Sequence, residues 1–272
     1  MVREKPYDGQ SGDLGLRLIS AAVLIPFALF VVWKGGSLLA FACGVFAAIM
    51  AYEWVRMSAS PSMKSFGTLA ILPFLPAILG LPVWALWVFV GGAFLATFTH
   101  PLKQKRGREA FGFLYVAGMP LALYFLREGD WDGAATALIL MGIVWGSDSA
   151  AFFFGRSLGG PRLHPDSPSK TWSGAIGGVA FSALCGVLAA YLTKGDLLCW
   201  IIVGALISVV AQVGDMFESS TKRRYGIKDS SAFVPGHGGL LDRVDGLGLV
   251  CIAAVLAFLF APSLPSGLGL VA

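Results

Sequence analysis

Apolar runs close to the length of a membrane-spanning helix follow one another along almost the whole chain. A helix needs about 20 mostly apolar residues to cross the hydrocarbon core of a bilayer, and about 17 are tolerated. The runs with this character cover residues of about 16–33, 38–55, 66–80, 82–98, 110–126, 133–154, 173–193, 197–216 and 246–261. The pattern predicts an all-α, polytopic integral membrane protein with about nine transmembrane helices.

Composition supports the same class of protein. The chain is 56% hydrophobic and 13% charged, whereas soluble domains contain about 25% charged residues. We find no internal repeat, linker or soluble domain, so the sequence predicts one membrane domain over residues 1–272. Within it, N-terminal spans cover about 16–126, and a catalytic C-terminal half covers about 133–261.

The basic residues predict how the chain is oriented. Cytoplasmic loops carry an excess of Lys and Arg. With nine spans and a cytosolic N-terminus, 17 of the 20 Lys and Arg residues lie on the cytosolic side. If the third and fourth spans are fused into one, only 7 of the Lys and Arg residues lie on the cytosolic side. The nine-span model also places the two long polar segments, about 155–172 and 217–245, at the cytosolic face, which points to a site that takes a soluble substrate.

Three carboxylates lie at the ends of the last two apolar runs. Asp215 ends the eighth run, and Asp242 and Asp245 begin the ninth. Because Asp242 and Asp245 are spaced i, i+3, a helix beginning near Leu240 places both on one face. Hard oxygen ligands suit Mg²⁺, which usually binds one or two carboxylates together with substrate phosphates. We therefore predict Asp215, Asp242 and Asp245 as metal ligands. The structural alternative for the last two is a favourable charge at a helix N-terminus.

Cations and glycines surround these acids in the stretch KDSSAFVPGHGGLLDRVDG, residues 228–246. The backbone N–H groups of a glycine loop can cradle phosphate oxygens. The cations Lys222, Arg223, Lys228 and Arg243 can neutralise several phosphate groups, although residues 222–224 also suit a cluster that binds anionic lipid headgroups. The combination predicts metal-dependent phosphoryl or nucleotidyl transfer at the membrane surface.

A second group of polar residues lies upstream, in WGSDSAAFFFGR (145–156) and SPSKTWSG (167–174). Asp148 is an acid inside an apolar run and is therefore a functional candidate; a buried pair with Arg156 is the alternative. Lys170 and Thr171 are candidate phosphate ligands, with Ser173 as the cap of the next helix. An interfacial anchor is the alternative for Lys170.

Glu53, in the second apolar run, is a further intramembrane acid. Its simplest explanation is an ion pair with Arg56 at i+3 on the same helix.

The segment SSTKRRYGIKDSSAFVPGHGGLLDRVD, residues 219–245, resembles the C-terminal motif of the phosphatidate cytidylyltransferases, or CDP-diacylglycerol synthases. That motif reads S-x-x-K-R-x4-K-D-x-[GSA]-x3-P-x-H-G-G-x-x-D-R-x-D. The matching residues are Ser219, Lys222, Arg223, Lys228, Asp229, Ser231, Pro235, His237, Gly238, Gly239, Asp242, Arg243 and Asp245. The family's D-x-x-A-Y-x-x-G-R and S-P-K-K-T-W-E-G patterns are present with changes, since Phe152 replaces Tyr and Ser169 and Ser173 replace Lys and Glu.

The resemblance implies that CTP and phosphatidic acid react to CDP-diacylglycerol and pyrophosphate with Mg²⁺, and a second cation is left open. The implied catalytic residues are Asp215, Asp242, Asp245, Lys222, Arg223, Lys228, His237 and Arg243. The implied substrate-binding residues are Asp148, Arg156, Lys170, Thr171, Ser219, Asp229, Gly238 and Gly239. Expected partners are CTP, phosphatidic acid and the lipid bilayer, with no nucleic acid, and a homodimer is left open. The expected location is a bacterial-type inner membrane, with several passes and the active site facing the cytosol.

Two other functions fit parts of this pattern. A CTP-dependent lipid kinase acting on a polyprenol-type alcohol would share the membrane, nucleotide and metal, but it would release CDP where a cytidylyltransferase releases pyrophosphate. An ion-coupled transporter would also use intramembrane acids such as Asp148 and Asp215. However, the charges crowd one end of the predicted spans, and no inverted repeat is visible.

Overall fold

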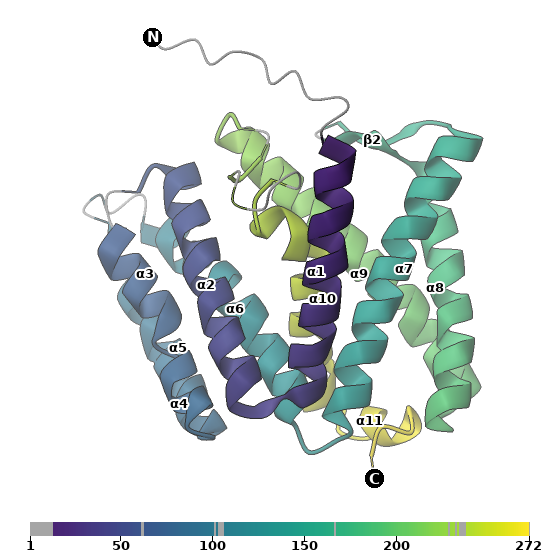
Figure 1. The fold of residues 1–272 in the computed structure, drawn as a ribbon, viewed down its shortest axis with the longest axis horizontal. Coiled ribbons are helices and arrows are strands. Elements are labelled where there is room, and N and C mark those ends of the chain that lie inside the picture. Colours follow the sequence, from purple (N-terminus) through teal and green to yellow (C-terminus); the bar gives the residue numbers. More distant parts are fainter. Residues whose placement is uncertain are drawn as a thin grey trace.

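The computed structural model describes residues 13–60, 63–100, 102, 106–165, 167–227, 229–231, 233 and 238–271. Helices make up nearly all of this part of the chain (Figure 1). Their bounds are α1 Asp13–Lys34, α2 Gly36–Ser58, α3 Met63–Ile71, α4 Phe74–Ile78, α5 Pro82–Ala96, α6 Arg106–Glu128, α7 Gly133–Leu158, α8 Trp172–Thr193, α9 Leu197–Arg224, α10 Leu241–Phe260 and α11 Leu264–Gly267. Two short strands, β1 Arg162–His164 and β2 Ser167–Thr171, form an antiparallel hairpin between α7 and α8.

Six helices in the described part of the chain are long and apolar enough to cross a membrane: α2, α6, α7, α8, α9 and α10. Shorter apolar helical segments cover Ala22–Lys34, Met63–Ile78 and Pro82–Ala96. Each apolar run of the sequence thus becomes helical, and the chain is a multi-pass membrane protein. The third run breaks between α3 and α4 next to Pro73, because proline removes a helical hydrogen bond and its ring crowds the preceding turn.

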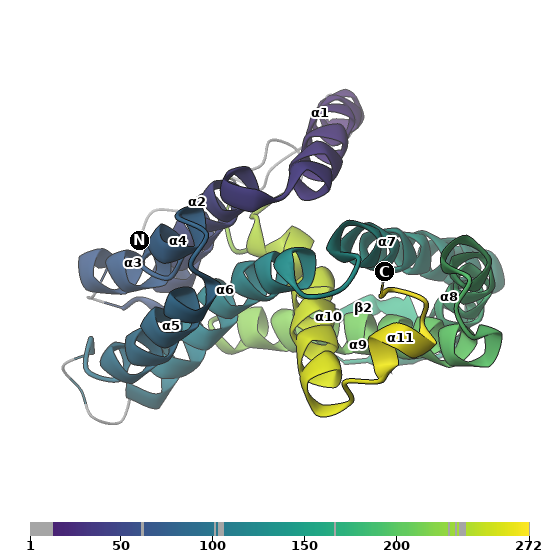
Figure 2. The same cartoon turned by 90° about the horizontal axis from the view of Figure 1, so that it is seen from below.

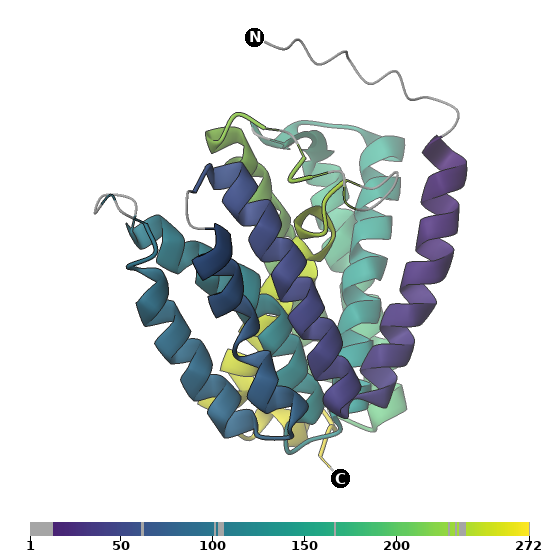
Figure 3. The same ribbon diagram turned by 60° about the vertical axis from the view of Figure 1, so that its left-hand side comes forward.

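Helix α10 lies at the centre of the bundle (Figure 2). It packs against α6, α7 and α9. Helices α2–α6 form one side of the molecule, and α7–α9 form the other. Helix α1 stands at one edge, where it contacts α2 and α7, and α3–α5 lie at the opposite edge (Figure 3). Residues at the N-terminal end of α10 can therefore meet groups from both sides of the bundle.

Small residues allow α7, α8, α9 and α10 to approach one another closely. A β-carbon added at Gly178 of α8 would lie 3.2 Å from the Ser147 carbonyl oxygen of α7. One added at Gly214 of α9 would lie 2.8 Å from the Asp245 carbonyl oxygen of α10. Lipid supplies no hydrophobic force between helices, so membrane bundles depend on such close packing. The contact at Gly214 brings the neighbouring Asp215 against the first turns of α10.

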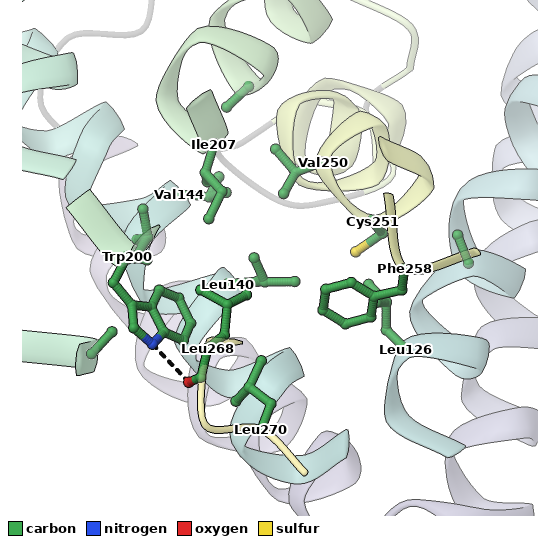
Figure 4. Packing of buried hydrophobic residues seen from close by; sticks show 14 of the residues in the cluster. Leu126, Leu140, Val144, Trp200, Ile207, Val250, Cys251, Phe258, Leu268 and Leu270 are labelled. Carbon is green, nitrogen blue, oxygen red and sulfur yellow. Dashed lines mark hydrogen bonds between the residues drawn. The ribbon is translucent and has the colours of Figure 1, made fainter. Parts of the chain in front are cut away.

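A buried apolar cluster joins helices α6–α10 to the C-terminal segment, which lies at the end of the bundle that carries α11 (Figure 1). Figure 4 shows Trp200, Leu140, Phe258 and Leu268 packed together there. Trp200 is 1% exposed, and its indole Nε1 donates a hydrogen bond of 2.8 Å to the Leu268 carbonyl oxygen. The C-terminal segment is thus fixed to the start of α9.

The β1–β2 hairpin was not expected from the sequence. It follows Gly159 and Gly160, whose φ angles of 62° and 115° lie in the region that glycine adopts without strain. Thr171, at the end of β2, caps α8, since its hydroxyl accepts a hydrogen bond of 3.2 Å from the Gly174 N–H. The prediction that Ser173 caps this helix is therefore wrong, because the Ser173 hydroxyl donates to the Gly159 carbonyl oxygen instead.

Candidate active site

Charged side chains gather where the hairpin, the end of α9 and the start of α10 meet, and they form two neighbouring groups. We call Asp148, Lys170, Asp215 and Asp245 the hairpin site, because β2 supplies its lysine. We call Glu218, Lys222, Ser230, Gly239 and Asp242 the loop site, because residues 229–240 supply two of its members. Helices α9 and α10 contribute acids to both.

The hairpin site places three carboxylates around one lysine. Lys170 Nζ lies 2.7 Å from Asp215 Oδ2. Asp245 lies close enough to interact electrostatically with Asp215 and Lys170, and so does Asp148. Carboxylates this close repel one another unless a cation neutralises them. The hairpin site therefore favours the binding of a further positive charge.

A cavity of about 510 Å³ opens beside the hairpin site. Two polar residues of its lining, Ser169 and Gln212, were not predicted as site residues. The other polar residues of the lining were predicted from the sequence: Asp148, Arg156, Lys170, Thr171 and Asp215. Phe152 and Leu163 add apolar wall. Such a mixed lining suits a ligand that joins an anionic group to an apolar one.

The loop site is more enclosed. Lys222 Nζ lies 2.7 Å from Glu218 Oε2 and 2.8 Å from Asp242 Oδ1. Asp242 Oδ2 also accepts hydrogen bonds from the Gly239 N–H at 2.9 Å and the Ser230 N–H at 3.2 Å. Glu218 was not predicted as a site residue, although its i, i+4 spacing from Lys222 was visible in the sequence. Its position shows that Lys222 is held between two acids from different helices.

The three predicted metal ligands divide between the two sites. Asp215 and Asp245 lie together in the hairpin site, while Asp242 is paired with Lys222 in the loop site. In this arrangement the described residues contain no group of three or more His, Cys, Asp or Glu side chains placed to bind a metal ion. Adjacent carboxylates nonetheless fit Mg²⁺, which completes its coordination with phosphates and water. Asp215 and Asp245 are the residues that could hold it.

The other predicted residues are dispersed. Arg223 and Asp229 are exposed. Arg223 Nη1 donates a hydrogen bond of 3.1 Å to the Ile227 carbonyl oxygen. Ser219 is half-buried on α9. Arg243 points into a separate, largely apolar cavity bounded by α1, α2, α6, α7 and α10.

The glycine loop is described only in part. Gly238 has a φ of 85°, as expected for a loop glycine, and Gly239 is buried. Lys228 and His237 lie outside the described residues, so their predicted roles stay predictions.

Glu53 does not pair with Arg56, and that expectation is wrong. The Glu53 carboxylate accepts hydrogen bonds of 2.8 Å from the Leu240 and Leu241 N–H groups, at the start of α10. Arg56 Nη1 instead donates to the Tyr52 hydroxyl at 3.2 Å. Glu53 is thus a residue of the site region that helical spacing alone could not reveal, since its partners lie 187 and 188 positions away in the chain.

This fold and site define a multi-pass membrane protein with a carboxylate- and lysine-rich site at one end of its helices. The model of the Cytidylyltransferase family matches residues 15–261. The chain is 38% identical to phosphatidate cytidylyltransferases of Brucella suis and Brucella melitensis, over 94% of this chain and 98% of those proteins. A phosphatidate cytidylyltransferase of Staphylococcus aureus is 30% identical over 86% of this chain and 95% of its own length. The chain belongs to the cytidylyltransferase family.

Proposed function

We propose that this chain is a phosphatidate cytidylyltransferase, which transfers CMP from CTP to phosphatidic acid and gives CDP-diacylglycerol and pyrophosphate. Family membership supports this, together with relatives of that name that align along nearly the full chain. The observation that carries the proposal is the Lys170–Asp215 pair, with Asp245 against it, beside a cavity with both charged and apolar walls.

The reaction is a displacement at phosphorus. An oxygen of the phosphatidate headgroup attacks the α-phosphorus of CTP, and the bond to the β-phosphate breaks, so that its electron pair leaves with pyrophosphate. The headgroup is already an anionic nucleophile and needs no strong general base. The main requirement is to bring two anions together, which positioned cations achieve.

The side chains divide this task. Lys170 and Arg156 line the cavity and can bind phosphate oxygens there. Asp215 and Asp245 would hold Mg²⁺, which supplies neutralisation of phosphate charge when bound. Lys222 forms ion pairs with two acids. Its main role would therefore be to order the loop site, and supplying positive charge would be secondary.

We further propose nine membrane crossings, with the N-terminus and the active site on the cytosolic side. The asymmetry of Lys and Arg in the sequence supports this orientation. The beginning of α1 and the hairpin lie at one end of the bundle, and the C-terminal segment lies at the other (Figure 1). An odd number of crossings agrees with that placement, and α3 with α4 and α5 would supply the two short ones. CTP, a soluble nucleotide, would then reach the site directly.

Product analysis tests the proposal. The purified protein is incubated in phosphatidate-containing vesicles with CTP and Mg²⁺, and both the lipid product and the released phosphate compound are identified. Formation of CDP-diacylglycerol with one pyrophosphate per turnover, dependent on phosphatidate, is the expected result. Release of CDP with a newly phosphorylated lipid alcohol would instead identify a lipid kinase. The D215N protein provides the background rate.

A further inference from the structure

Glu53 makes a set of contacts that the proposed mechanism does not use. It lies on α2, in the N-terminal half of the chain, and is 0% exposed. Its Oε1 accepts from the Ser231 hydroxyl and from the Leu240 N–H, and its Oε2 accepts from the Ser230 hydroxyl at 3.3 Å and from the Leu241 N–H. Each carboxylate oxygen thus serves two donors, and all four donors belong to the segment that leads into α10.

These contacts satisfy a need of α10. The first N–H groups of any helix lack acceptors within the helix. The N-cap residue of α10 is Leu240, whose side chain cannot accept a hydrogen bond. Glu53 supplies the missing acceptors from another helix, and a negative charge at a helix N-terminus is electrostatically favourable. The N-terminus of the helix that carries Asp242 and Asp245 is therefore capped by α2.

Gly239 permits this approach. A β-carbon at position 239 would overlap the Ser230 hydroxyl and lie 2.8 Å from Glu53 Oε1. The segments 230–231 and 239–241 also donate hydrogen bonds to Asp242, through the Ser230 and Gly239 N–H groups. Glu53 and Asp242 therefore hold the segments at 230–231 and 239–241 together, and Asp242 in turn fixes Lys222.

We propose that Glu53 is a positioning residue for the reaction: it holds residues 230–231 and 240–241 in place so that Asp242 and Lys222 keep their positions. It acts through these groups and does not touch the reacting atoms. The inference rests on the proposed function only for the part that Asp242 and Lys222 play in turnover. The order of the loop itself is independent of that function.

The test replaces Glu53 by Gln, which keeps the shape of the side chain but turns one acceptor oxygen into an NH₂ group facing two donors. Hydrogen–deuterium exchange of residues 229–241 is measured in nanodiscs without nucleotide, together with kcat and KM for CTP. We expect exchange of the Leu240 and Leu241 amides to be at least ~10-fold faster, following loss of their acceptors. We also expect kcat to fall by roughly 10- to 100-fold, with Glu53→Asp recovering part of both properties.

Glu128→Gln is the matched control. Glu128 also accepts a backbone hydrogen bond, 2.8 Å from the Gly36 N–H, but at the start of α2. This variant should leave both the exchange of residues 229–241 and the value of kcat unchanged. If E53Q does not yield folded protein, Ser230→Ala combined with Ser231→Ala removes two donors to Glu53 and keeps its carboxylate. Faster exchange of residues 229–231 and a lower kcat are then expected.

Two results would overturn the inference. Parental exchange rates in residues 229–241 of E53Q would show that Glu53 does not order the loop. Faster exchange with parental kcat and KM would show that the contact is only structural. If the parent protein makes no CDP-diacylglycerol, the proposed function fails, while the exchange measurement still decides whether Glu53 holds the loop.

Discussion

The hairpin site and the loop site contain the same chemistry, a lysine between acids, but differ in their access to solvent. The side chains of Lys170 and Asp215 are 29% and 24% exposed and face a cavity. In the loop site, Lys222 is 12% exposed and its two acids are each 6% exposed. An accessible ion pair contributes little stability and can exchange partners, whereas an enclosed pair is difficult to break without a large penalty. The comparison supports the proposal that the hairpin site binds the substrates, and it suggests that the loop site maintains the structure around them.

The largest effect should come from the shared acid of the hairpin site. Asp215→Asn removes the charge that faces both Lys170 and Asp245, and we expect turnover to fall at least ~1000-fold, as for loss of a principal electrostatic group. Pyrophosphate release from CTP and phosphatidate measures this, and the thermal midpoint should stay close to that of the parent. A D215N protein with parental turnover would exclude the hairpin site from catalysis.

The two lysines should differ in stability. Lys222→Met leaves Glu218 and Asp242 facing each other without a cation, which should cost about 3 kcal/mol of folding free energy. Lys170→Met breaks a more accessible pair and should cost about 1 kcal/mol or less. Thermal unfolding of both proteins in the same detergent measures the difference. Equal midpoints would remove the distinction between the two sites.

A smaller effect is expected at the edge of the cavity. Asp148→Asn changes one charge that faces Lys170 and Asp215, so we expect kcat/KM for CTP to fall by roughly 30-fold, equivalent to about 2 kcal/mol. Ser149→Ala is the neighbouring control, because the Ser149 hydroxyl donates to the Trp145 carbonyl oxygen of its own helix. If the two variants show the same kinetics, Asp148 has no part in the reaction.

The smallest effect concerns the cap that positions Lys170. Thr171→Ala removes the acceptor for the Gly174 N–H and should lower the free energy of unfolding by about 1 kcal/mol. Thr171→Ser keeps the hydroxyl and should retain most of that stability. Chemical denaturation of the three proteins side by side gives the values. A parental value for T171A would mean that the start of α8 does not depend on its cap.

The sequence predicted the helices well because a bilayer demands long apolar segments, and their lengths are visible without knowledge of packing. It also placed Asp242 and Asp245 at the start of a helix, since α10 begins at Leu241. These properties are local, so a short stretch of sequence contains them.

The sequence did not predict properties that depend on contacts between distant segments. The expected partner of Glu53 was Arg56, three residues further along the same helix. The observed partners include Ser230 and Leu240, which are far away in the chain. Likewise, the sequence predicted Asp242 and Asp215 as ligands of the same metal ion. In the structure, Asp242 instead forms an ion pair with Lys222 in the loop site. The β1–β2 hairpin also escaped prediction, because its strands have only 3 and 5 residues.

The length of α9 has a consequence for how a lipid would be handled. The helix has 28 residues and is therefore about 42 Å long, whereas the hydrocarbon core is about 30 Å thick. Asp215 lies about 27 Å along it from Leu197, so a hydrocarbon core that begins at Leu197 would end within about one helical turn of Asp215. Under the proposed function, a phosphatidate molecule would then present its phosphate while both of its tails stay in the leaflet. The nucleotide would then diffuse to the site through water, while the lipid stays in the membrane.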